Sequence, residues 1–193
     1  VLLLVSAAQA QQYVDTAARA DARKTNEPQA VETFRDRGLG MFIHWGVDGV
    51  LGGVISHSLV GASPDFQDRF FRLLPGYFDP YRFEPERWAA LAQLAGFRYV
   101  MFTAKHHAGF CMWDTATTSF GVMHTPYGKD VLRAVIDAFR KRGIAIGIYF
   151  SPDDFHWLHE HGITIDRHVK GVYPQDLPEF MAYTKRQLKE LLT

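Results

Sequence analysis

The stretch that decides the expected fold is Phe97-Arg98-Tyr99-Val100-Met101-Phe102-Thr103, a short and almost continuous apolar block. Two blocks of the same kind lie at residues 39–45 and 144–150. Apolar runs of this length are typical of strands that are buried on both faces, as in a parallel sheet. The three blocks therefore predict three parallel strands.

Helical patterns separate and follow these blocks. Apolar residues recur at helical spacing twice, and a third helix is expected from Pro178 to Leu192. The two spaced sets are Trp88, Leu91, Ala92 and Ala95, which end at Gly96, and Leu132, Val135, Ile136 and Phe139, which end at Gly143. Strands and helices that alternate in this way predict an α/β protein.

The connections between these elements are uneven in length. Those that enter the strands are short, whereas those that leave them are long, at about residues 46–83, 104–128 and 151–176. Long loops at the carboxyl ends of parallel strands carry the active sites of barrel enzymes. A (β/α)₈ barrel needs about 250 residues. The fold class expected here is therefore an incomplete (β/α)₈ TIM-like barrel, made of about the first three βα units.

Composition excludes several classes of protein. The 193 residues include 21 Lys and Arg and 21 Asp and Glu, so the formal net charge is zero. A nucleic-acid binder or a polybasic membrane-surface protein would carry a basic excess. The single cysteine, Cys111, excludes a disulfide framework within the chain and a cysteine-rich zinc site. Oligomeric state is left open.

The amino-terminal residues resemble an export signal. Residues 1–7 are mostly apolar, and Ala8-Gln9-Ala10 fits a signal-peptidase cleavage pattern. We interpret residues 1–10 as the remnant of a secretory signal peptide, too short to cross a membrane. Residues 11–193 are then the amino-terminal part of a catalytic barrel in a secreted or periplasmic protein.

Each predicted strand ends in polar or aromatic side chains. These are His44 and Trp45, then His106 and His107 with Trp113 further on, and Tyr149. Because the carboxyl ends of parallel strands share one edge, we expect these groups to converge there. Imidazole and phenol groups suit hydroxyl partners, and aromatic faces cover the C–H face of a ring. Together they predict a sugar site.

Several linked motifs over residues 34–155 resemble family 29 of the glycoside hydrolases, the α-L-fucosidases. They are Gly40-Met41-Phe42-Ile43-His44-Trp45-Gly46, the run from Trp88 to Val100, Lys105-His106-His107 with Gly109-Phe110, and Gly147-Ile148-Tyr149-Phe150-Ser151. This resemblance implies a retaining exo-glycosidase that hydrolyses terminal α-L-fucose from glycans or glycoconjugates, with no cofactor and no metal.

The resemblance also implies residue roles. His44, His106, His107 and Tyr149 would contact the fucose hydroxyls, and Trp45 would support the wall of the pocket. His57 and Trp113 are further candidates. The catalytic nucleophile and the acid/base are expected downstream of Thr193, so that no catalytic carboxylate is assigned within this chain.

Two positions depart from the family pattern. Ala108 stands where the family usually has Asp. The family's Glu-Trp pair in the first loop has no counterpart, and Ser56-His57-Ser58-Leu59 occupies that region, with His57 as a candidate substitute. These departures affect the choice of substrate more than the fold.

Two other functions remain open. One is a metal-dependent hydrolase that uses His156, His159 and His161, although their spacing is not H-E-x-x-H and a solvated loop is the simpler interpretation. Adjacent His106 and His107 could join such a site, but they would point to opposite sides if extended. The other is a sugar-binding module without catalysis. Asp153 and Asp154 are expected to cap a turn.

Overall fold

A computed structural model describes residues 26–193 except 54 and 167–168. The expected signal-peptide remnant at residues 1–10 lies outside the described residues. Helix α1 (Pro28–Arg37) belongs to an amino-terminal unit that ends at Gly38, and the remaining elements belong to a second unit, residues 39–193. The described part of the chain contains no helix that is both long enough and apolar enough to span a membrane.

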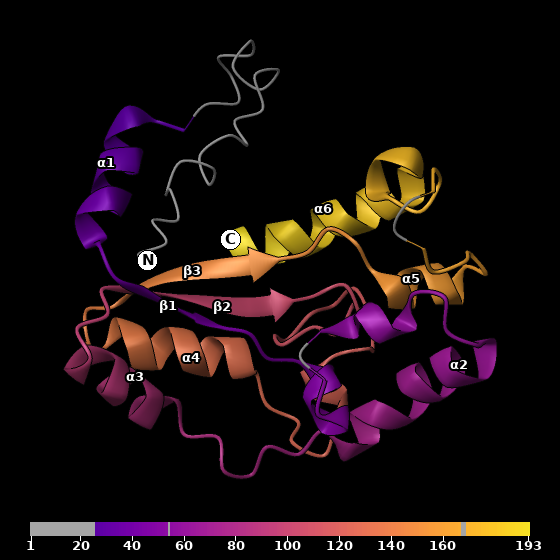
Figure 1. The fold of residues 1–193 in the computed structure, drawn as a ribbon, viewed down its shortest axis with the longest axis horizontal. Helices are drawn as coiled ribbons and strands as arrows, with labels where there is room; N and C mark the ends of the chain where they lie inside the picture. The colour runs from indigo at the N-terminus through magenta and orange to yellow at the C-terminus, as the bar shows by residue number, and fades with distance from the viewer. Residues whose placement is uncertain (1–25, 54, 167–168) are drawn as a thin grey trace, which may run out of the picture. The chain divides into compact units, whose positions relative to one another are not determined.

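The second unit is built on a parallel sheet of β1 (Gly40–Ile43), β2 (Tyr99–Lys105) and β3 (Ala145–Phe150), in the order β1-β2-β3 (Figure 1). The predicted strands and their parallel arrangement are confirmed within a few residues at each end. Met41 lies opposite Val100 in the register, and Thr103 lies opposite Tyr149.

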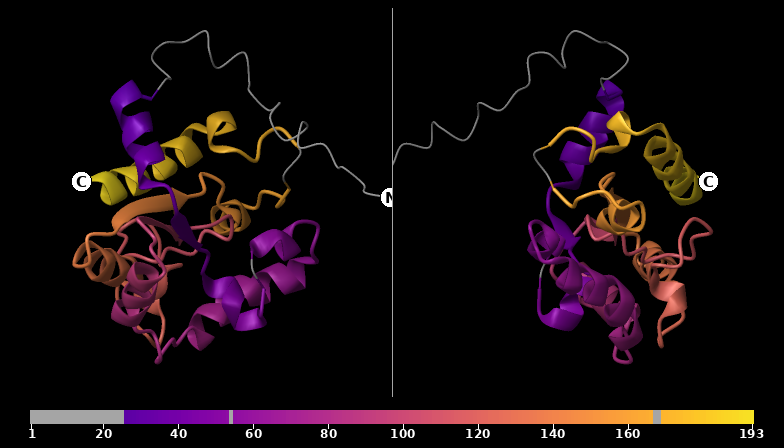
Figure 2. Two further views of the ribbon diagram at one scale, coloured as in Figure 1. Left: turned by 60° about the vertical axis from the view of Figure 1, so that its left-hand side comes forward. Right: turned by 90° about the vertical axis from the view of Figure 1, so that its right-hand side faces the viewer.

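The helices that separate and follow the strands also match the sequence pattern. They are α3 (Pro85–Leu94) and α4 (Val131–Arg140), which pack against each other on one face of the sheet, and α6 (Pro178–Leu192), which runs beside β3 (Figures 1 and 2). The Asp130 side chain caps α4 by accepting a hydrogen bond from the Arg133 N–H at 2.7 Å.

The expected loops hold more structure than the sequence indicated. The first loop contains α2 (Pro64–Leu73) and three short 3₁₀ turns, at Val47–Leu51, Ser56–Leu59 and Leu74–Tyr77. The third loop contains α5 (Phe155–Glu160) and a 3₁₀ turn at Pro174–Asp176. Another 3₁₀ turn, Val122–His124, lies in the second. Side-chain caps start both helices: Ser63 accepts from the Phe66 N–H, and Asp154 accepts from the Trp157 N–H at 2.8 Å. Asp154 therefore caps a helix and not merely a turn.

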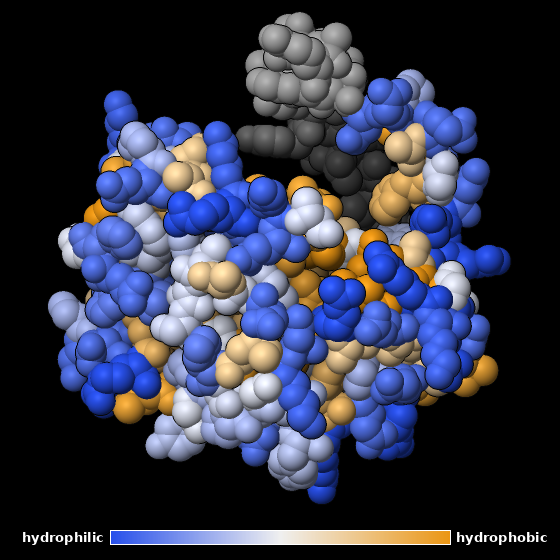
Figure 3. Space-filling view, turned by 180° about the vertical axis from the view of Figure 1, so that it is seen from behind, coloured by the Kyte–Doolittle hydropathy of each residue, from blue (hydrophilic) through white to orange (hydrophobic). Residues whose placement is uncertain are grey.

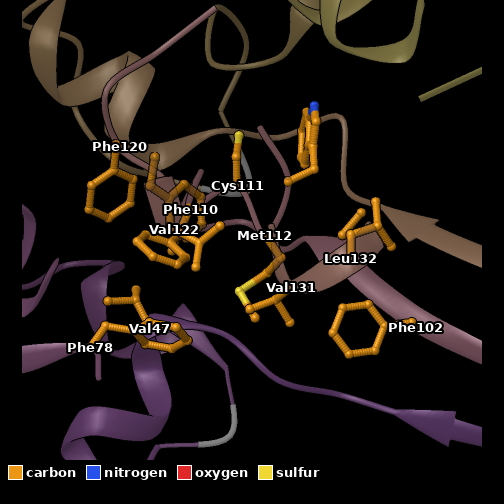
Figure 4. Packing of buried hydrophobic residues seen from close by; sticks show 14 of the residues in the cluster. Val47, Phe78, Phe102, Phe110, Cys111, Met112, Phe120, Val122, Val131 and Leu132 are labelled. Carbon is orange, nitrogen blue, oxygen red and sulfur yellow. The ribbon is translucent and has the colours of Figure 1, made fainter. Parts of the chain in front are cut away.

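The main core lies between the sheet and its helices and continues under the long loops. In Figure 4, Phe110, Phe120 and Val122 from the second loop lie close together, with Val47 and Phe78 from the first loop nearby. All five side chains are buried. Packing between the two loops gives them a fixed shape, which a site at the strand ends requires.

The two faces of the sheet differ. On β2, Val100, Phe102 and Ala104 are fully buried. On the alternate face, Gly147 approaches Met101 so closely that a Cβ there would lie 2.7 Å from the methionine Cε, and Gly40 leaves room for the ring of Tyr99. Phe42 on this second face is 53% exposed. Apolar side chains are also exposed on the side of the molecule shown in Figure 3.

Candidate active site

Three strand ends bring four of the predicted site residues together. The ring of His106 lies 4.6 Å from that of His44, 4.1 Å from that of His107 and 5.5 Å from that of Tyr149, all between centroids. Tyr149 and His106 are stacked at 18°. The expected convergence at one edge of the sheet is confirmed, with His106 at its centre.

The turn after β2 explains how adjacent histidines reach the same place. Strand pairing is irregular between Thr103 and Lys105, and the His106 C=O accepts a hydrogen bond from the Gly109 N–H at 2.9 Å. Gly109 has a φ of 90°, and a Cβ at this position would collide with Asp154. The chain is therefore not extended at His106 and His107, so the expectation that they point to opposite sides does not apply.

His107 is the most enclosed of the site histidines. Its Nδ1 lies 2.5 Å from the Ser151 Oγ and 3.4 Å from an oxygen of Asp153. Its backbone C=O accepts a hydrogen bond from the Phe155 N–H at 2.7 Å. Both the ring and the backbone of His107 are thus held by residues that follow β3.

His57 also reaches this group of rings, from the 3₁₀ turn at Ser56–Leu59. Its ring stacks on His107 at 5.6 Å and 13°, and lies 6.4 Å from His106. The His57 side chain is exposed, so it forms an outer edge of the cluster.

The two tryptophan candidates occupy different surroundings. Trp45 packs among Phe78, Phe83 and Trp88, with ring centroids 5.3–5.7 Å apart. Trp113 is buried, and its indole N–H donates to the carboxylate of Glu190 on α6 at 3.0 Å. Trp45 therefore packs within an aromatic group that follows β1, whereas the hydrogen bond of Trp113 links the second loop to α6.

Burial affects the charge of the first histidine. Loss of solvent lowers the pKa of His44 below its usual 6.5. His44 is therefore neutral at pH 7, with one nitrogen that donates and one that accepts a hydrogen bond. A neutral imidazole of this kind suits a hydroxyl partner.

A buried ion pair that sequence reasoning did not single out lies beneath the histidines. The Lys105 Nζ is 2.9 Å from an oxygen of Asp154, and both side chains are fully buried. The Tyr183 hydroxyl donates to the same oxygen at 3.2 Å, and it accepts from the Gln187 amide at 2.8 Å. A lysine that ends an apolar strand was the sequence signal for this network.

A second buried carboxyl follows β1. Asp48 is 6% exposed, and its Oδ1 has no hydrogen-bond partner among the described residues. Burial raises the pKa of Asp48 from 3.8 to about 6, although a hydrogen bond with its own backbone opposes the shift. Asp48 is not among the residues that the sequence pattern singled out.

The three histidines on and next to α5 do not gather at one point. His156 and His159 lie 5.3 Å and 4.9 Å from the ring of Phe71, and His156 also stacks on Phe120 at 4.4 Å. His161 instead stacks on Trp157 at 3.7 Å. Within residues 26–193, apart from the three undescribed positions, no group of three or more His, Cys, Asp or Glu side chains is arranged to hold a metal ion. The metal-dependent alternative gains no support from this cluster.

Comparisons with known proteins bear on this site. A family model described as Alpha-L-fucosidase matches residues 2–193. The putative alpha-L-fucosidase 1 of Oryza sativa is 40% identical over 85 residues, 42% of this chain and 16% of that protein. Human tissue alpha-L-fucosidase is 33% identical over 141 residues, 65% of this chain and 30% of that protein.

Solved structures agree. One is the structure of a GH29 alpha-L-fucosidase from Bacteroides thetaiotaomicron, described as a trapped covalent intermediate in complex with 2-fluoro-fucosyl fluoride. Its sequence is 31% identical to this chain, and the TM-score is 0.68. The match covers 86% of this chain and 39% of that one. The chain thus spans well under half the length of the proteins it matches. Because the family model covers nearly all of its residues, the chain belongs to the alpha-L-fucosidase family.

Proposed function

We propose that the protein is a retaining exo-glycosidase that hydrolyses terminal α-L-fucose from glycans or glycoconjugates. The observation that carries this proposal is the contact of His44, His107 and Tyr149 with the central ring of His106. Three strand ends supply hydroxyl-binding groups at one place, as a sugar pocket requires. The related Bacteroides enzyme, described as a covalent intermediate with a fucosyl compound, supports both the substrate class and the retaining mechanism.

We further propose that residues 39–193 form the first three βα units of a (β/α)₈ barrel. Helices cover one face of the sheet. Phe42 on the other face is half exposed, and in a closed barrel the remaining strands would cover it. An apolar groove of about 560 Å³ runs along the outer side of β1. Its lining includes Met41, Ile43, Trp88, Leu91 and Phe97. The remaining units of a barrel would cover both surfaces.

In this proposal the described residues bind the sugar, and other residues perform the chemistry. Retention needs a nucleophile and an acid/base whose carboxyl groups lie about 5–5.5 Å apart. Asp154 is buried in its ion pair with Lys105, and Asp153 lies against the imidazole of His107. Both carboxylates are thus engaged by neighbouring side chains. In this proposal both catalytic carboxyl groups come from sequence that follows Thr193.

The substrate-binding roles follow the geometry. His44, His106, His107 and Tyr149 bind hydroxyl groups, and Trp45 stiffens the segment after β1. His57 closes the outer edge, where the family's Glu-Trp pair is absent. Trp113 acts through the fold of the second loop, because its indole N–H is held by Glu190.

The proposed protein is also exported. The support is the Ala8-Gln9-Ala10 pattern after an apolar run. Amino-terminal sequencing of the protein from its native host should begin at Gln11. A start at or before Val1 would contradict export through this signal.

The function is tested with the complete protein and an aryl α-L-fucoside. We expect turnover, and we expect nuclear magnetic resonance of the early reaction mixture to show the α-anomer of fucose before mutarotation. The β-anomer as first product would contradict retention. Binding of fucose without turnover would favour the sugar-binding module, and turnover that depends on bound zinc would favour the metal-dependent hydrolase.

A further inference from the structure

The surroundings of the His107 ring determine which of its nitrogens carries the proton. Its Nδ1 faces two oxygen atoms at the end of β3: the Ser151 Oγ at 2.5 Å and an Asp153 carboxylate oxygen at 3.4 Å. The side chains of His107 and Asp153 are only 11% and 16% exposed, so water competes weakly for these contacts.

The backbone of Ser151 is held in position. Ser151 is 1% exposed, and its backbone N–H donates to the Lys105 C=O at 3.0 Å. That bond ties the end of β3 to the end of β2, two residues before His107. The side-chain contact between Ser151 and His107 therefore starts from a buried residue whose backbone is bonded to the sheet.

The chemistry of the two oxygens distinguishes the tautomers. A hydroxyl can donate or accept, but an ionised carboxylate only accepts. If Nδ1 were unprotonated, its lone pair would face the negatively charged oxygen of Asp153 without an intervening proton. With a proton on Nδ1, Ser151 accepts the hydrogen bond and Asp153 stabilises the N–H dipole.

We propose that Ser151 and Asp153 are positioning residues that hold neutral His107 as the Nδ1–H tautomer, so that its Nε2 accepts a hydrogen bond from a substrate hydroxyl. This inference rests on the proposed function, because it names the partner of Nε2 as a sugar hydroxyl. His107 then always accepts a hydrogen bond through Nε2. The pocket therefore favours a substrate with a hydrogen-bond donor at this position.

The test is the tautomer itself, measured on the complete protein with ¹⁵N-labelled histidine. Long-range proton–nitrogen correlation spectra at neutral pH distinguish a protonated ring nitrogen from an unprotonated one. The His107 signals are those that disappear in His107→Gln. We expect a protonated Nδ1 and an unprotonated Nε2. An Nε2–H tautomer, or a ring protonated on both nitrogens, in the unmodified protein overturns the proposal, whatever the variants do.

The variants separate positioning from a merely structural role. Ser151→Ala and Asp153→Asn should each move His107 toward the Nε2–H tautomer, and Ser151→Ala should lower kcat/KM on an aryl α-L-fucoside by roughly 3- to 10-fold. Ser151→Thr retains the hydroxyl and should retain the tautomer. Asp137→Asn, an exposed aspartate on α4, is the matched control and should change neither measurement. Unchanged His107 signals in both Ser151→Ala and Asp153→Asn would overturn the proposal.

The two proposals fail in different ways. The tautomer is read without substrate, so a protonated Nδ1 in a protein that does not hydrolyse fucosides leaves the positioning roles intact and contradicts the function. An Nε2–H tautomer in an active fucosidase contradicts the positioning roles alone.

Discussion

Two groups of histidines lie close in sequence to strand ends, yet their surroundings differ. His44, His106 and His107 come from two segments more than 50 residues apart, and their rings meet. His156, His159 and His161 lie within six residues on or next to α5, yet they do not form one cluster: His156 and His159 pack against Phe71, whereas His161 stacks on Trp157. Proximity in sequence therefore did not bring the three α5-region histidines together, whereas the convergence of separate strands did so for the other three.

Each region also contains a buried aspartate, and the two aspartates differ in their hydrogen-bond partners. Asp154, at the start of α5, is paired with Lys105 and accepts two further hydrogen bonds, from the Trp157 N–H and the Tyr183 hydroxyl. Asp48, which follows β1, has an oxygen without a partner among the described residues. The region with the dispersed histidines thus holds the satisfied carboxylate, and the region with the candidate site holds the unsatisfied one.

The largest effect is expected from the ion pair that connects the two regions. Lys105→Met leaves the buried Asp154 carboxylate without its cation, which should lower the free energy of unfolding by about 3–5 kcal/mol. Urea denaturation of the complete protein measures this change. Arg72→Met breaks an exposed pair with Asp68 and should cost less than about 1 kcal/mol. Equal losses in the two variants would mean that Lys105 does not connect the regions.

The next effect concerns Asp48 and pH. Its native pKa of about 6 exceeds the ordinary 3.8, so the folded protein binds more protons than the unfolded chain between these values. The contribution of Asp48 to the free energy of unfolding is therefore fully present at low pH. As the pH rises from about 4 to 6, the free energy of unfolding falls by roughly 2–3 kcal/mol. Asp48→Asn should remove this loss.

Urea denaturation at pH 4.5 and pH 7.5 measures the pH dependence. The Asp48→Asn variant should gain stability relative to the unmodified protein at the higher pH only. An identical difference between the two proteins at both pH values would show that Asp48 titrates normally.

A smaller effect separates the histidine groups by activity. His44→Ala and His107→Ala should each lower kcat/KM on an aryl α-L-fucoside by an amount equivalent to about 1–3 kcal/mol, because a polar substrate group loses its partner. His161→Ala, on the exposed end of α5, should remain within about twofold of the unmodified enzyme. If the three variants lose activity equally, the contrast between the two groups fails.

The smallest effect is expected from metal removal. Because the described residues hold no group of three or more His, Cys, Asp or Glu side chains arranged around a metal ion, dialysis against a chelator should leave the thermal midpoint and the fucosidase activity unchanged. Calorimetry and the aryl fucoside assay measure the two quantities. A loss of activity that zinc restores would revive the metal-dependent alternative and would show that the α5 group forms a site after all.

Local sequence patterns predicted the regular elements well. The apolar spacing and flanking Gly96 and Gly143 located α3 and α4, and the expected helix from Pro178 to Leu192 has the same bounds in the structure. The helices α2 and α5 were not predicted. Helix α5 has only six residues, and α2, although as long as α3 and α4, lies within a polar and aromatic segment. Capping by Ser63 and Asp154 and contacts with the core stabilise them.

The sequence by itself determined that polar residues follow three parallel strands, because strand direction places every carboxyl end at the same edge. It also determined the family, through linked motifs. Only the tertiary structure decided how the site is supported. The turn at His106, the Ser151 contact with His107 and the Lys105–Asp154 pair all join residues more than 40 positions apart or depend on a backbone bend. Such contacts depend on distances in space, which residue spacing along a chain does not contain.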